Sequence, residues 1–127
     1  MIKSNIKTSN LINYKNTILI YNILRDLGLI PTLKGTKFLN KAIQIVLNSD
    51  NEFIVLEDVY RKIALNYTNF NSVQVRNAIK YAIDNRDEEK SIVNFEKIFG
   101  YKYNSYYFTN KAIIEEIVRV VRYTRLV

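Results

Sequence analysis

The chain has 127 residues, 48% of them hydrophobic, which suits one buried core rather than two. It contains no cysteine and no histidine, which excludes disulfides, thiolate zinc sites and the usual general base at neutral pH. We therefore expect one non-enzymatic domain without metal or cofactor. Nineteen lysines and arginines against twelve aspartates and glutamates give a net charge of +7, which favours an anionic partner, nucleic acid or an acidic membrane surface.

The first fifteen residues are mostly polar and basic, with isolated apolar positions. This composition predicts a flexible arm over 1–15, followed by one folded domain over 16–127. No segment has the features of a secretory signal or the roughly 20 apolar residues of a membrane span. The expected location is therefore the cytoplasm.

Helical periodicity begins after this arm. Thr17 is predicted to cap a first helix, which Gly28 would end in the left-handed conformation. Second and third helices are predicted over 36–47 and 56–66, where apolar residues recur at three-to-four spacing.

A fourth helix is predicted over 72–85, with Asn71 or Ser72 as its cap. The charged residues 86–90 are interpreted as a connector, and a short fifth helix would end at Gly100.

Thr109 is predicted to cap a sixth helix that is apolar on more than one narrow stripe. Such a helix is either fully buried in the monomer or available for a dimer contact. The aromatic segment from Tyr101 to Phe108 leaves three alternatives open: a strand, a wing, or a loop packed on the core. Altogether the sequence predicts an all-α domain of about six helices.

The third and fourth predicted helices, joined by a short polar turn, match a helix-turn-helix whose second helix enters the major groove of DNA. On a helical wheel, one side of the fourth helix is apolar, formed by Val75, Ala78, Ile79, Ala82 and Ile83. The opposite side carries candidate base-reading residues: Val73, Gln74, Arg76, Asn77, Lys80 and Tyr81.

These residue types suit DNA recognition. Asn and Gln can bond bidentately to adenine, Arg can do so to guanine, and an exposed Val can touch a thymine methyl group. Lys62 and Arg86 are candidates for phosphate contacts, whereas Asp84 argues against binding because phosphates repel a carboxylate. No residue is predicted to be catalytic or to bind a metal.

Several spaced motifs run along 17–123. They are Leu27-Gly28 followed by Pro31 and Lys34-Gly35, Leu39 with Ala42-Ile43, Val59-Tyr60 with Ile63-Ala64, the apolar side of the fourth helix, Ile98-Phe99-Gly100-Tyr101, and Thr109-Asn110. This order resembles the DNA-binding C-terminal domain of the stage zero sporulation protein A family. The resemblance implies six helices, a recognition role for the fourth, tandem copies on double-stranded DNA, and contacts with RNA polymerase.

The resemblance is uneven. The framework positions of the family's recognition helix are kept, but its reading positions, which are Ser, Arg, Glu, Arg, Arg and His in the family, are replaced here. We therefore expect an operator different from the family's. Family members also carry a phosphorylatable receiver domain, which fifteen residues are too few to form, so we expect no such control within this chain.

Two alternatives to a sequence-specific regulator remain. The same fold can serve as a protein-interaction module or antagonist that binds RNA polymerase or a full-length relative, or as an accessory in plasmid or phage DNA processing. An enzyme is the least favoured reading, because adjacent acidic residues on a helix point about 100° apart and do not form paired acids.

Overall fold

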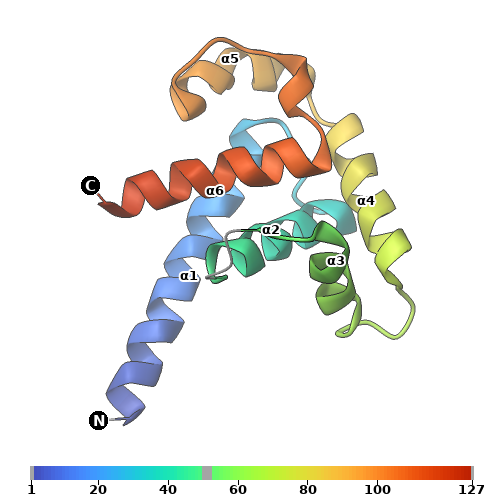
Figure 1. Ribbon diagram of the computed structural model, residues 1–127. Helices are drawn as coiled ribbons and strands as arrows, with labels where there is room; N and C mark the ends of the chain where they lie inside the picture. The colour runs from blue at the N-terminus through green and yellow to red at the C-terminus, as the bar shows by residue number, and fades with distance from the viewer. Residues whose placement is uncertain (1, 50–52, 127) are drawn as a thin grey trace.

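The computed structural model describes the backbone of residues 2–49 and 53–126 and the side chains of 14–49 and 53–124. Over this part of the chain it contains helices and no strand, which confirms the predicted all-α domain (Figure 1). The elements are α1 (Ile2–Asp26), α2 (Lys34–Leu47), α3 (Leu56–Ala64), α4 (Ser72–Asp84), α5 (Glu88–Phe99), the 3-10 turn η1 (Ser105–Tyr107) and α6 (Asn110–Leu126).

Helix α1 is longer than predicted, and its first part extends away from the other helices (Figure 1). No glycine or proline interrupts the sequence from Ile2 to Asp26, so the helix can propagate at little cost once it has formed. Thr17 lies inside this helix, where its hydroxyl donates to Gln44 Oε1 at 3.0 Å. The prediction that Thr17 caps the helix is therefore wrong, whereas the division into an arm and a domain stays a prediction.

Helix α2 lies at the centre and contacts α1, α3, α4 and α6. Its apolar stripe, which includes Leu39 and Ile43, is fully buried. Each such side chain contributes about 1.5–3 kcal/mol relative to exposure. Most apolar residues of α6 are buried in the same core, namely Ile113, Ile114, Ile117, Val118 and Val121. Burial within the monomer therefore accounts for these side chains. None of the helices in the described ranges combines the length and apolarity needed to cross a membrane.

Two glycines permit close backbone contacts. Gly28 ends the first helix with φ 93°, and its carbonyl accepts from the Asp87 amide at 2.8 Å. Gly35 lies against α4, where an added Cβ would lie 1.8 Å from the Ala78 carbonyl oxygen. Any side chain at Gly35 would therefore push α2 and α4 apart.

The segment from Tyr101 to Phe108 is a loop with one 3-10 turn, packed on the core as one of the three alternatives anticipated. Its rings surround Phe95, with the Tyr101 and Tyr103 centroids each 5.5 Å from the Phe95 centroid. The Tyr101 hydroxyl donates to Glu116 on α6 at 2.5 Å. Burial, followed by this hydrogen bond, raises the pKa of Tyr101 above its ordinary value, so the phenol stays protonated and keeps the loop attached to α6.

Helix α5 begins earlier than predicted, within the charged stretch interpreted as a connector. Asp87 caps it by accepting from the Glu89 and Lys90 amides, and Gly100 ends it with φ 85°, as predicted. Glu88 and Glu89 occupy the first turn, where the helix dipole favours negative charge. The charges therefore stabilise the start of α5 rather than mark a connector.

Candidate nucleic-acid interface

Helices α3 and α4 pack against each other across the turn 65–71, an arrangement that fits a helix-turn-helix. Asn71 begins α4 with a capping box, because its side chain accepts from the Gln74 amide while Gln74 Oε1 accepts from the Asn71 amide, both at 2.9 Å. The Ser72 hydroxyl donates to Glu57 of α3 at 2.6 Å. The capping box stabilises the first turn of α4, and the hydrogen bond from Ser72 to Glu57 joins that turn to α3.

An aromatic cluster of Phe38, Tyr67 and Phe70 holds the turn onto α2. Both turn rings lie edge-on to Phe38, with centroids 5.2 Å from its own. Lys41 of α2 also donates to the Tyr67 hydroxyl at 2.8 Å. The composition of this segment predicts only a polar turn, whereas the structure anchors it through Tyr67 and Phe70. Two aromatic rings inside a polar turn are the signal that could have predicted this anchoring.

Asn110, at the start of α6, connects three helices. Its Nδ2 donates to the Arg76 carbonyl of α4 at 3.1 Å and to the Tyr60 hydroxyl of α3 at 3.3 Å. Thr109 caps α6 as predicted, accepting from the Ala112 amide at 3.2 Å. The beginning of α6 is therefore held against both helices of the candidate helix-turn-helix.

The six candidate base-reading residues of α4 are all exposed, in the sequence order Val73, Gln74, Arg76, Asn77, Lys80 and Tyr81. The two bulkiest of the six with apolar character, Val73 and Tyr81, are 45% and 60% exposed. The opposite side of α4 is buried at Val75, Ile79, Ala82 and Ile83, with Ala78 half-buried. The structure thus gathers the six side chains on one open surface, which we call the outward face of α4.

Two of these side chains already have partners. Gln74 is engaged in the capping box, and Lys80 Nζ lies 2.7 Å from Asp84 Oδ2. The ion pair neutralises the one carboxylate of α4, which weakens the repulsion expected between Asp84 and phosphate.

The two predicted phosphate contacts differ in position. Lys62 is exposed on α3. Arg86 is not, because its side chain is only 8% exposed and its guanidinium lies 3.7 Å from the centre of the Phe108 ring. It donates to Ser91, to the Ile83 carbonyl and to Tyr103. Its position therefore does not support a phosphate contact, and Arg86 instead joins α4, α5 and the aromatic loop.

Two depressions border α6. The first, which we call the α4–α6 cleft, has a volume of about 430 Å³ and separates the outward face of α4 from the start of α6. Its lining residues are Leu56, Tyr60, Arg76, Lys80, Ile83, Asp84, Phe108, Thr109, Asn110 and Lys111. It thus joins an apolar floor to a mainly basic rim.

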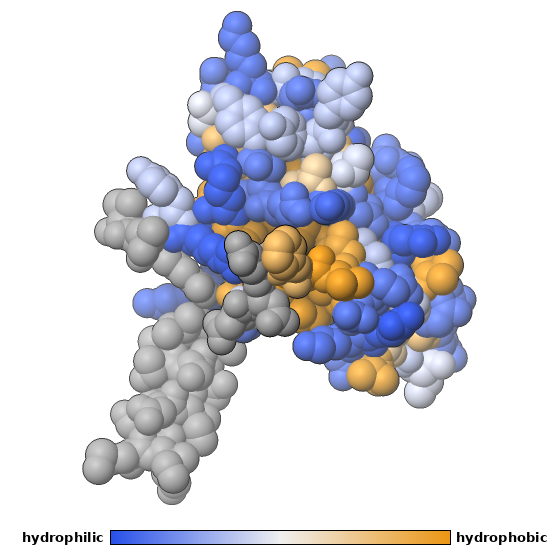
Figure 2. All heavy atoms as spheres, viewed as in Figure 1, coloured by the Kyte–Doolittle hydropathy of each residue, from blue (hydrophilic) through white to orange (hydrophobic). Residues whose placement is uncertain are grey.

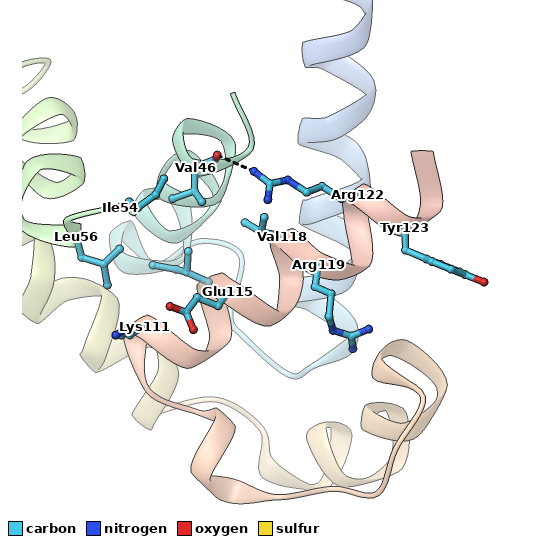
Figure 3. A pocket seen from close by; sticks show the side chains of 10 residues that line it. Val46, Ile54, Leu56, Lys111, Glu115, Val118, Arg119, Arg122 and Tyr123 are labelled. Atoms are coloured by element: carbon cyan, nitrogen blue, oxygen red, sulfur yellow. Dashed lines mark hydrogen bonds between the residues drawn. The ribbon is translucent and has the colours of Figure 1, made fainter. Parts of the chain in front are cut away.

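The second depression, which we call the α6 groove, has a volume of about 560 Å³ and runs along α6 opposite the end of α2 (Figure 3). Its floor includes Val46, Ile54 and Val118, and Arg122 spans it by donating to the Val46 carbonyl at 3.5 Å. Figure 2 shows a hydrophobic area near the middle of this view, whereas the side where Figure 1 places α4 is mostly hydrophilic. The outward face of α4 and the α6 groove therefore differ in chemistry.

No curated protein and no solved structure matches the chain. The family model described as sporulation initiation factor Spo0A C terminal matches residues 20–121, which is well over half of the chain. That family consists of DNA-binding domains that regulate transcription in sporulation, and not of enzymes. The match, on a six-helix domain with an exposed α4, shows that the chain belongs to the Spo0A C-terminal family and is a DNA-binding regulator.

Proposed function

We propose that the chain is a sequence-specific transcriptional regulator in which α3 and α4 form the helix-turn-helix and α4 enters the major groove. The observation that carries this proposal is the open outward face of α4 on a helix held from behind by α2, α3 and α6. The major groove, about 12 Å wide, admits a helix presented in this way.

Within this arrangement the residues have distinct roles. Asn77 lies at the centre of the outward face and can bond bidentately to adenine, while Val73 can contact a thymine methyl group. Gln74 and Tyr81 flank them on one edge. Arg76 lies on the other edge, and Lys80 lies between Arg76 and Val73. Arg76 and Lys80 contact either guanine or phosphate, and Lys62 of α3 contacts phosphate.

The operator is proposed to differ from the family's. The buried side of α4 keeps the framework of the family helix, whereas the outward face carries other side chains. Only the outward face reads base edges. New side chains there, on a helix whose buried side is kept, therefore alter sequence preference without altering the way the domain docks.

Selection of bound sequences from a random duplex pool tests the proposal. We expect one enriched motif, and its spacing would report whether copies bind singly, in tandem or as a homodimer. The matched control is a chain with Val73 and Asn77 both changed to alanine, which should fold but lose the enrichment. If the full chain bound duplexes but no sequence motif became enriched, base-specific reading would be contradicted.

A second candidate function is contact with a protein partner, either RNA polymerase or a full-length relative. The α6 groove favours it, together with Phe53 and Val55 beside the groove's Ile54, which are 85% and 59% exposed. Large exposed apolar side chains beside a groove are typical of protein-binding surfaces. Binding to purified polymerase without duplex affinity at low salt would favour this candidate over the first.

A further inference from the structure

We infer that the α4–α6 cleft holds the phosphate backbone of one DNA strand, and that Lys111 of α6 supplies a phosphate contact outside the helix-turn-helix. This inference rests on the proposed function. It assigns the cleft a ligand, the sugar-phosphate chain bordering the groove that α4 enters, and it moves Arg76 and Lys80 from the base-reading set to the phosphate-binding set.

The charge of the cleft supports an anionic ligand. Three cations line it, Arg76 and Lys80 from α4 and Lys111 from α6, and all three are exposed. Asp84 is the one acid among the described lining residues, and Lys80 neutralises it at 2.7 Å. The rim therefore keeps a net charge of about +2, which suits a polymer carrying one negative charge per 1.7 Å of duplex axis.

The position of the cleft supports a backbone contact rather than a base contact. Arg76, Lys80 and Ile83 follow one another at four and three positions along α4, so they lie along the same edge of the helix. Ile83 is buried on the floor of the cleft, which shows that this edge faces α6. Asn77 lies about 100° round the helix from Arg76, near the centre of the outward face, and Val73 lies between Asn77 and Lys80. A helix inserted in the groove directs its centre to the bases and its edges to the flanking strands.

The cleft is also held in place. The Asn110 side chain joins the first turn of α6 to the Arg76 carbonyl and to Tyr60, and Lys111 is the next residue along α6. Figure 1 shows that first turn beside α4. Because these contacts attach α6 to the edge of α4, Lys111 keeps a constant position relative to Arg76 and Lys80, as a register-setting phosphate contact requires.

The first experiment measures affinity of the full chain and of Lys111→Ala for the selected duplex as a function of salt. One lost phosphate contact should reduce the log–log salt slope by about 0.9, so the loss of affinity between 50 and 200 mM salt should become roughly 3-fold smaller. The preferred sequence should not change. The control is Lys97→Ala, which removes an exposed lysine of α5 away from the cleft and should leave the slope unchanged.

The second experiment replaces single phosphates of the same duplex with neutral methylphosphonates. At the phosphate that Lys111 contacts, neutralisation should weaken binding of the full chain. The same neutralisation should not weaken binding of Lys111→Ala further, because the two changes remove the same contact. Strictly additive losses at every position would overturn the inference.

Three further outcomes decide between this inference and the proposed function. Sequence-selective binding with an unchanged slope in Lys111→Ala overturns the phosphate cleft and leaves the proposed function standing. Failure of the full chain to bind any duplex at low salt overturns both. A changed base preference in Lys111→Ala would overturn the phosphate contact of Lys111, because Lys111 would then be a base-reading residue. Equal thermal unfolding of Lys111→Ala and the full chain checks that the fold is intact.

Discussion

The two sides of α4 obey different constraints. Its buried side meets α2, α3 and α6 and contains small residues where backbones approach closely, such as Ala78 and Ala82 beside Gly35. Its outward face has no such restriction, because its side chains meet solvent. Close packing limits the buried side to side chains of matching size and shape, whereas the side chains of the outward face are limited only by what they bind. The side chains of the outward face can therefore change without disturbing the packing of α4 on the core.

The largest expected effect comes from a change on the buried side. Ile79→Ala removes a fully buried side chain from the contact between α4 and the core, and should lower the free energy of unfolding by about 2–5 kcal/mol. Denaturant titration measures this loss. Ile92→Ala, the same chemical change at a 50% exposed position on α5, is the matched control and should cost far less. Equal losses of unfolding free energy in the two variants would mean that α4 does not pack on the core through Ile79.

A second change pushes the two helices apart instead of leaving a cavity. In Gly35→Ala the new Cβ would meet the Ala78 carbonyl oxygen at 1.8 Å and Ala82 Cβ at 2.9 Å. The free energy of unfolding should fall by about 1–3 kcal/mol, because α2 and α4 must shift to make room. Thermal unfolding checks this result against Lys37→Ala, an exposed change on the same helix. An unchanged midpoint for Gly35→Ala would contradict the close approach of the helices.

The outward face should respond in binding rather than in stability. Asn77→Ala should weaken binding to the selected duplex by about 1–3 kcal/mol and binding to random duplexes little. Its free energy of unfolding should stay within about 0.5 kcal/mol of the unmodified chain. Lys80→Ala is the comparison, because loss of a phosphate contact weakens both duplexes alike. Equal losses on both duplexes for Asn77→Ala would rule out base reading at that position.

The smallest effect concerns the acid at the end of α4. Asp84→Asn removes a carboxylate near the proposed path of the phosphates and releases Lys80 from its ion pair. Binding to every duplex should tighten by roughly 0.2–1 kcal/mol, the scale of an exposed ion pair. Fluorescence anisotropy at low salt measures this change, and Glu89→Gln on α5 is the control for a change in net charge alone. Weaker binding by Asp84→Asn would show that Asp84 positions Lys80 instead of opposing DNA.

Local sequence signals determined most of the helices and the register of α4. Asn71 and Thr109 act as caps, Gly28 and Gly100 end helices with positive φ, and the predicted apolar stripe of α4 lies on the core. These features depend on residues within one or two turns of each other, so helical periodicity and capping chemistry are sufficient to predict them. The six candidate reading residues shared a face for the same reason.

Only the tertiary structure decided which charged groups face solvent and which elements border α4. Arg86 and Lys80 are both basic and lie six positions apart, yet one is packed against Phe108 and the other lies open beside Lys111. Asn110 reaches Arg76 across 34 positions of sequence. Contacts of this kind depend on how whole helices pack, and a periodic pattern within a single helix carries no information about its neighbours. For that reason the sequence alone identified the candidate reading helix, and the fold identified the cleft beside it.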